Sequence, residues 1–158
     1  MQAVRRILAA GFAVVGIAAL LVAGTGMPGA HAQGQAFRIG VAIPLSGPLA
    51  PEGRQVQRAY ELWKAVVNAE GGIAVNGRRY PVEIIYYDDE SSEQQSGQLT
   101  EQLIPVDNVD LLLGGVGDAS VLAASTVAER YGYPYFFGGA SADPIFDRGH
   151  YFTFGLLN

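Results

Sequence analysis

The amino-acid sequence predicts an α/β fold built on a parallel sheet. Short apolar runs typical of buried strands alternate with segments of helical periodicity, which is the pattern of parallel βαβ winding. Most of the strand-like runs end in loops rich in Gly, Ser or Pro, where the backbone can approach a neighbour or a ligand closely. Together these observations predict a Rossmann-like parallel sheet with helices on both faces.

Residues 1–32 have the organisation of a secretory signal peptide. A short basic region precedes the uncharged apolar stretch 7–23, and Ala30-His31-Ala32 fits the small-x-small cleavage pattern. Helix-breaking Gly and Pro residues follow the apolar stretch at once, which favours a cleaved signal over a membrane anchor. We therefore expect cleavage near Ala32 and a mature chain of residues 33–158, which suffices for one core but not for two domains.

Charge and cysteine content exclude some classes of partner and of covalent modification for this chain. The whole chain carries a net charge of −5, and without the expected signal, which holds two Arg and no acid, this becomes −7. An acidic chain without a basic patch does not suit nucleic acid, so we expect no nucleic-acid partner. The chain has no Cys, which excludes disulfides and a lipid anchor on Cys.

The first part of the fold is expected to be a strand, a defined turn and an amphipathic helix. The apolar run 37–43 predicts a strand that stops at Pro44, and the loop 44–48 holds two Pro and one Gly. In segment 54–70 apolar residues recur at three- and four-residue spacing, which predicts a helix that packs by one face. Gly71-Gly72 ends this helix.

A hairpin, a second long strand and a second helix are expected next. Asn76-Gly77 between the short runs 73–75 and 78–80 favours a tight turn. The apolar run 82–87 predicts a buried strand, and segment 93–103 predicts a helix.

The remaining segments predict the other half of the sheet. The run 109–113 predicts a third sheet strand, and segment 120–131 a helix with Ala and Val on one face. The aromatic run 134–137 predicts a fourth strand, and 151–154 a fifth.

A binding site is expected in the loops at the carboxyl ends of these strands, because ligands of open parallel sheets bind there. These loops cover residues 44–53, 88–93, 114–120 and 138–143. The last, Gly-Gly-Ala-Ser-Ala-Asp, is the most informative. Small residues with one hydroxyl after a buried strand leave backbone N–H groups open to a cleft, which suits a small carboxylate. The pattern favours binding rather than bond breaking.

Three other groups of residues resemble a metal site, a nucleotide site or a hydrolase site but match the pattern of each poorly. Asp88-Asp89-Glu90 could be a metal cluster, yet adjacent acids on such a loop more often cap and solvate, and no His or Cys is near. Segment 115–120 partly imitates a dinucleotide fingerprint, but Ser120 replaces the third Gly and the segment follows the third strand. His150 is the only His after the signal, and without a Gly-x-Ser-x-Gly elbow a Ser hydrolase lacks its base and nucleophile. We expect no metal, no cofactor and no enzyme activity.

Five motifs occur in a characteristic order along the chain. They are Ile43-Pro44-Leu45-Ser46-Gly47-Pro48, Asn68-Ala69-Glu70-Gly71-Gly72-Ile73, Tyr87-Asp88-Asp89-Glu90, Leu113-Gly114-Gly115 and Gly139-Ala140-Ser141. This set resembles the type I periplasmic binding proteins that deliver branched-chain amino acids (the Leu/Ile/Val-binding proteins), amides and related acids to ABC transporters. The resemblance implies a two-lobed, hinged periplasmic receptor that traps a small amino acid or a related amide or carboxylate and serves a membrane ABC permease. Since the family's chains are more than twice as long, we expect residues 33–158 to form a partial N-terminal lobe, with the second lobe absent, of a fragmentary or truncated copy.

By this resemblance one set of ligand contacts falls on the loop after the fourth sheet strand. Gly139, Ala140 and Ser141 correspond to the family's Ala-Ala-Thr-like turn, with the hydroxyl kept at Ser141. Leu45 and Ser46 would lie close to the ligand's other side.

The other expected contact loop, Asp118 to Ser120, departs from the family pattern. Asp118 stands where relatives often carry a Ser that holds the ligand carboxylate, and an acid there would repel a carboxylate. Three interpretations stay open: Ser120 takes the role, Asp118 caps the third helix, or the ligand presents an amine or amide at this place.

Two other functions also stay open. A ligand-sensing domain of a receptor or regulator with the same fold would show the same residues. A nucleotide-dependent enzyme is a remote alternative, given the imperfect fingerprint at 115–120.

Overall fold

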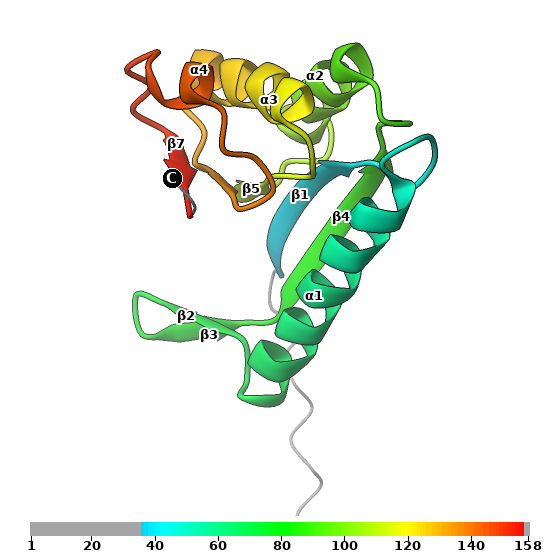
Figure 1. Cartoon of the computed structure of the whole chain (residues 1–158). Coiled ribbons are helices and arrows are strands. Elements are labelled where there is room, and N and C mark those ends of the chain that lie inside the picture. Colours follow the sequence, from blue (N-terminus) through cyan, green and yellow to red (C-terminus); the bar gives the residue numbers. More distant parts are fainter. Residues whose placement is uncertain (1–35, 157–158) are drawn as a thin grey trace, which may run out of the picture. The chain divides into compact units, whose positions relative to one another are not determined.

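A computed structural model describes residues 36–156 (Figure 1). Its main sheet has five parallel strands in the order β4-β1-β5-β6-β7, which confirms the predicted class. The strands are β1 (Phe37–Ile43), β4 (Val82–Asp88), β5 (Leu111–Leu113), β6 (Tyr135–Phe137) and β7 (Thr153–Gly155). The expected signal peptide, residues 1–32, lies outside the described residues.

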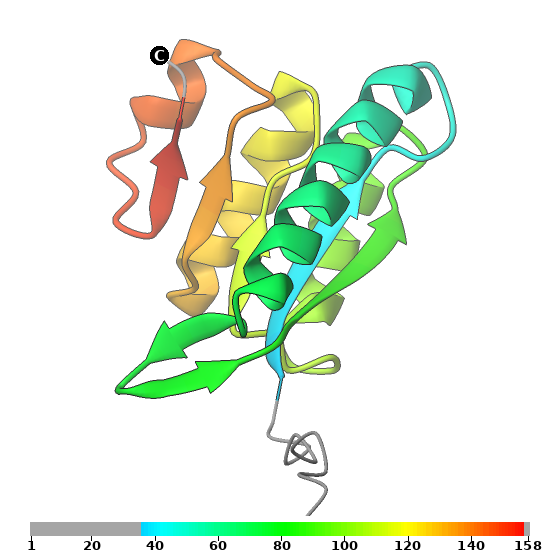
Figure 2. The same cartoon turned by 90° about the horizontal axis from the view of Figure 1, so that it is seen from below.

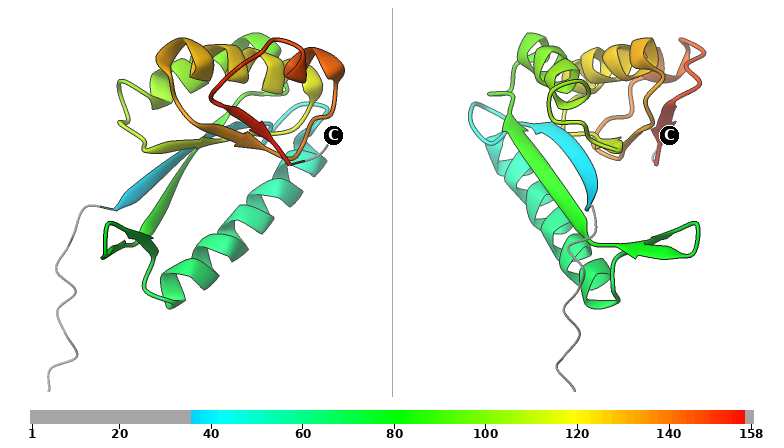
Figure 3. Two further views of the ribbon diagram at one scale, coloured as in Figure 1. Left: turned by 90° about the vertical axis from the view of Figure 1, so that its left-hand side faces the viewer. Right: turned by 180° about the vertical axis from the view of Figure 1, so that it is seen from behind.

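Helices cover both faces of this sheet. The long helix α1 (Ala50–Ala69) crosses one face, and α2 (Glu93–Leu103) and α3 (Asp118–Tyr131) lie side by side on the other (Figures 2 and 3). A short helix, α4 (Asp143–Phe146), follows β6. The predicted helices on both faces are therefore confirmed.

Each face of the sheet has its own apolar core because side chains alternate along a strand. On the α1 side, Ile39, Val41 and Ile43 of β1 pack with α1 residues such as Tyr60. On the other side, the core is formed by β5, β6, α2 and α3, with fully or almost fully buried residues that include Leu103, Leu112, Val121, Tyr135 and Phe137. In this arrangement every strand of the central sheet ends at the same edge, which sets the position of the loops.

The predicted hairpin is confirmed. Strands β2 (Ile73–Val75) and β3 (Arg78–Tyr80) pair antiparallel, outside the main sheet. Both turn residues, Asn76 and Gly77, have positive φ angles of 50° and 79°, as the Asn-Gly pair predicts for a tight turn of this kind.

The predicted start of α1 is wrong. The helix begins at Ala50 rather than Arg54, because Pro51 occupies its first turn, where a missing N–H costs no hydrogen bond. Gly53 lies inside the helix where a side chain would collide with the carbonyl oxygen of Pro44. Pro51 and Gly53 are therefore typical of a loop in the sequence, although both lie in α1.

Other boundaries differ by a few residues. β5 begins at Leu111 rather than Val109, because the Val109 N–H donates to the Leu103 carbonyl at the end of α2 (3.3 Å). α3 begins at Asp118 rather than Ser120, and β7 at Thr153 rather than Tyr151. The short helix α4 was not predicted. No helix between residues 36 and 156 has both the length and the apolar character that a membrane span requires.

Candidate functional site

The carboxyl ends of the parallel strands bring four loops to one edge of the sheet (Figure 1). These loops follow β1 (residues 44–49), β4 (89–92), β5 (114–117) and β6 (138–142). We call this set the loop edge. Its hydrogen bonds show which of the residues singled out in the sequence come together.

The loops after β5 and β6 are in direct contact through glycines. The Gly117 N–H donates to the Gly139 carbonyl (3.1 Å), and a side chain at Gly139 would collide with the carbonyl oxygen of Gly115. Ala140 next to it is 7% exposed. Gly139 is therefore required for close loop packing, which the sequence did not indicate.

Asp118 links the same two loops by its side chain. Its Oδ1 accepts hydrogen bonds from the backbone N–H groups of Ser141 (2.9 Å) and Ala142 (3.1 Å). The residue that caps α3 is Gly117, with φ of 95°, and the helix has no side-chain cap. The interpretation of Asp118 as the N-cap of the third helix is therefore wrong, because its carboxylate bonds to the neighbouring loop.

The two serines of the predicted site differ in exposure. Ser141 is exposed at the loop edge, whereas Ser120 is 5% exposed, and its carbonyl accepts a hydrogen bond from the Ser96 hydroxyl of α2 (3.2 Å). Ser120 thus belongs to the packed contact between α2 and α3. Of these two hydroxyls, the structure leaves that of Ser141 open to solvent.

Leu45 and Ser46 are held at the loop edge by Asp88, a residue that the sequence did not single out for this role. Asp88 Oδ1 accepts from the N–H groups of Leu45 (2.9 Å), Ser46 (3.1 Å) and Glu90 (2.9 Å). Burial by itself would raise the pKa of Asp88, but these hydrogen bonds outweigh it and lower the pKa below its usual value. The sequence indicates this arrangement only by an acid, Asp88, at the end of one predicted strand and by a Pro- and Gly-rich loop at the end of another.

The Ser91 hydroxyl adds a second link between the loops after β4 and β1. It donates to the Ser46 carbonyl (2.9 Å) and accepts from the Leu49 N–H (3.0 Å). Ser46 itself is exposed. The loop after β1 therefore has a fixed backbone and an open serine side chain.

Asp89 differs sharply from its neighbour. Its side chain is fully buried, Oδ1 accepts from the Ser91 N–H (2.9 Å), and Oδ2 has no hydrogen-bond partner within the described residues. Burial raises the pKa of Asp89 to about 6, and the charge of Asp88 adds to this effect. The expectation that acids here cap the loop holds for Asp88 and Asp89, but the expected solvation is wrong for Asp89.

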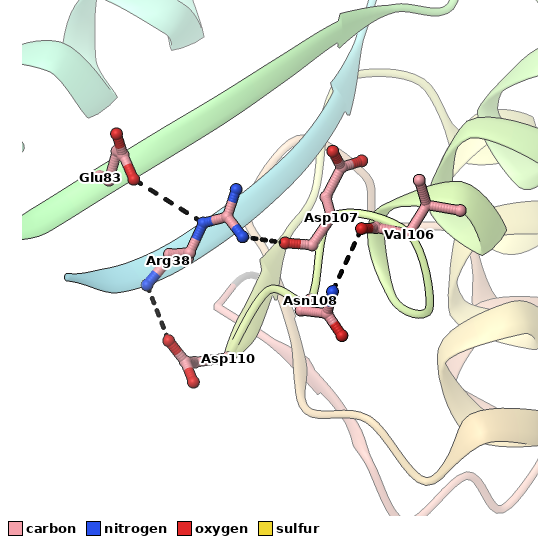
Figure 4. Close-up of polar contacts among 6 residues, drawn as sticks. All are labelled: Arg38, Glu83, Val106, Asp107, Asn108 and Asp110. Atoms are coloured by element: carbon pink, nitrogen blue, oxygen red, sulfur yellow. Dashed lines mark hydrogen bonds and ion pairs between the residues drawn. The ribbon is translucent and has the colours of Figure 1, made fainter. Parts of the chain in front are cut away.

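The remaining polar features lie away from the loop edge. At the amino ends of the strands, Arg38 donates to Asp110 and to the Asp107 carbonyl and forms an ion pair with Glu83 (3.7 Å), which ties β1 to its neighbours (Figure 4). An open groove of about 600 Å³ runs between α2 and α3. Within residues 36–156 no group of three or more His, Cys, Asp or Glu side chains is arranged to hold a metal ion.

In open parallel α/β sheets ligands bind beyond the carboxyl ends of the strands, and the ordered small-residue loops of this chain lie at that edge. The family model described as "Periplasmic binding protein" matches residues 36–156. The chain therefore belongs to this family, within the type I proteins of the branched-chain amino acid group.

Individual relatives agree with this assignment. The Leu/Ile/Val-binding protein homolog 7 of Brucella melitensis is 36% identical over 123 residues, which is 78% of this chain and 30% of the relative. The branched-chain amino acid transporter substrate-binding protein LivJ of Streptococcus pneumoniae, solved with isoleucine, superposes with a TM-score of 0.70 at 26% identity, over 77% of this chain and 33% of that one. A solute-binding protein of an ABC transporter from R. palustris, solved with benzoate, gives a TM-score of 0.64 at 31% identity, over 77% and 32%. The chain thus spans about a third of the length of these relatives.

Proposed function

We propose that this chain supplies the N-terminal part of the binding site of an extracytoplasmic solute-binding protein, which captures a small amino acid or a related amide or carboxylate for an ABC importer. The observation that carries the proposal is the family match over residues 36–156. The relatives named above are binding proteins whose solved examples hold isoleucine or benzoate. Both ligands are small molecules with a carboxylate and an apolar body.

The geometry of the loop edge supports a binding role. Ser141 and Ser46 present exposed side chains on backbone segments that Asp118, Asp88 and Ser91 hold in place. Donors fixed before the ligand arrives cost little ordering entropy on binding. The Ser141 hydroxyl and the backbone of Gly139 and Ala140 would contact one end of the ligand, and Leu45 and Ser46 would lie near its other side.

The mechanism requires no bond breaking. In a two-lobed receptor the ligand bridges the lobes and stabilises the closed form, because it binds that form more tightly. A membrane permease would then recognise the closed form. Because the chain covers about a third of its relatives, we infer that a second lobe is needed for the complete trap.

Replacing the Ser141 hydroxyl tests the proposed site. Ser141→Ala should weaken the binding of an amino acid or carboxylate about five- to thirtyfold, since a hydrogen bond to a charged group contributes about 1 to 2 kcal/mol. Titration calorimetry with a panel of branched-chain amino acids, their amides and benzoate measures this. Gln98→Ala, on the exposed side of α2, is the control and should leave the affinity unchanged. Equal affinities of the Ser141 variant and the control would remove Ser141 from the site.

Export is a separate part of the proposal. We infer that residues 1–32 direct the chain to the periplasm and are removed near Ala32. The mass of the protein recovered from a periplasmic extract should correspond to a chain that begins at Gln33. Recovery of the uncleaved chain in the membrane fraction would contradict this inference.

A further inference from the structure

The Asp118 carboxylate occupies two backbone N–H donors at the proposed binding edge. The N–H groups of Ser141 and Ala142 lie beside the exposed Ser141 side chain, and both donate to Asp118 Oδ1. A backbone N–H makes one good hydrogen bond at a time. A ligand carboxylate therefore has to displace the Asp118 side chain before it can use these two donors.

The charge at this point is also unfavourable for a carboxylate. Asp118 is the first residue of α3, so its negative charge already compensates the partial positive charge at the start of that helix. Asp118 is exposed, and among residues 36–156 no Lys, Arg or His forms an ion pair with it. Only Oδ1 receives the two N–H bonds, so Oδ2 is left as an acceptor.

We propose that Asp118 is a specificity-determining residue, which makes the edge between the loops after β5 and β6 accept an ammonium or amide N–H group and reject a carboxylate. The inference rests on the proposed function, since it concerns the ligand of the same loop edge. An amine or amide donates to Oδ2 while the link from Oδ1 to Ser141 and Ala142 stays intact. A ligand with a carboxylate would have to place it elsewhere, such as near Leu45 and Ser46.

Two substitutions separate the charge of Asp118 from its hydrogen bonds. Asp118→Asn removes the charge but keeps a carbonyl oxygen that accepts from both N–H groups. Asp118→Ser removes the charge and, with its shorter side chain, frees the donors. In Asp118→Asn the amide protons of Ser141 and Ala142 should keep slow hydrogen exchange, and in Asp118→Ser they should exchange faster. This readout requires no ligand.

Three probes with one apolar skeleton test the specificity: 3-methylbutylamine, 3-methylbutanamide and 3-methylbutanoate. Each is titrated into the full chain while the backbone amide signals of residues 138–142 are followed by NMR. In the wild type the amine and the amide should shift these signals, and 3-methylbutanoate should bind at least tenfold more weakly. Asp118→Asn should lose at least tenfold in affinity for the amine, and Asp118→Ser should gain at least tenfold for 3-methylbutanoate.

The outcomes distinguish this inference from the function on which it rests. If 3-methylbutanoate shifts the signals of the wild type as readily as the amine does, the inference is wrong and the binding function stands. The same holds if the Asp118 variants keep the wild-type order of affinities. If no probe and no amino acid of the calorimetry panel affects the loop edge in any variant, the proposed binding function itself is wrong for this chain.

Discussion

The buried carboxyl of Asp89 should make the stability of the protein depend on pH. Asp89 is fully buried with Oδ2 unpaired, and burial raises its pKa from 3.8 to about 6. The folded state therefore binds a proton more tightly than the unfolded state. The stabilising effect of this proton is complete below about pH 4 and is lost as the pH rises through 6.

The size of the effect follows from the two pKa values of Asp89. A difference of one pKa unit corresponds to about 1.4 kcal/mol, so the shift from 3.8 to about 6 lowers the free energy of unfolding by at most about 3 kcal/mol between acid and neutral pH. Two titratable neighbours, Asp88 and Tyr135, are coupled to Asp89. Both change their protonation outside the pH range from about 4 to 6 in which Asp89 does. The pKa of Asp88 lies below its usual value and that of Tyr135 above its own.

Asp89→Asn tests this reasoning because an amide does not titrate. The wild-type free energy of unfolding should fall between pH 4.5 and 7.5, and that of the variant should fall less by up to about 2 kcal/mol. Urea denaturation followed by circular dichroism at constant ionic strength measures both curves. Asp147→Asn, an exposed acid at the end of α4, is the control and should keep the wild-type slope. Parallel curves for the wild type and Asp89→Asn would refute the account of this residue.

Two further substitutions test the packing of the loop edge. Asp88→Ala frees the N–H groups of Leu45, Ser46 and Glu90 and should lower the free energy of unfolding by about 2 kcal/mol at pH 7. Since the folded-state pKa of Asp88 is lowered, this difference should begin to shrink as the pH falls below about 4 and keep shrinking as the pH falls through the lowered pKa, and a difference that stays constant over this range would contradict the charge-based explanation. Gly139→Ala should cost about 2 kcal/mol, because its methyl group meets the Gly115 carbonyl. The matched change Gly97→Ala, which meets Ala123 at an ordinary 3.6 Å, should be neutral or stabilising in the same urea titration, and equal effects of the two would show that the loops are not in close contact.

The sequence predicted the elements whose ends carry local signals. Helix α2 was placed correctly at both ends; in the structure Ser92 is its N-cap and accepts from the Gln95 N–H. The start of α1 was missed because Pro51 and Gly53 have the local character of a loop, while the contact of Gly53 with Pro44 is tertiary. The position of the loops at the carboxyl ends of the strands followed from the parallel pattern, whereas the strand order β4-β1-β5-β6-β7 was not predicted.

The contacts within the candidate site were harder to predict. The bond from Asp118 to Ser141 joins residues 23 positions apart, and that from Asp88 to Leu45 joins residues 43 apart. Neither residue type differs from an ordinary capping acid in the sequence alone. Only the packing of neighbouring loops decides that Asp118 is a link between loops, that Ser120 is buried and that Asp89 lacks a second partner.

The most direct test of the binding account is hydrogen exchange of the full chain, read by mass spectrometry with and without each ligand of the amino acid, amide and benzoate panel. We expect at least one ligand to slow the exchange of segments 44–49 and 138–142 while the hairpin 73–80 is unchanged. Exchange that no ligand alters at the loop edge, or that slows only along the groove between α2 and α3, would contradict the claim that this edge is the binding site.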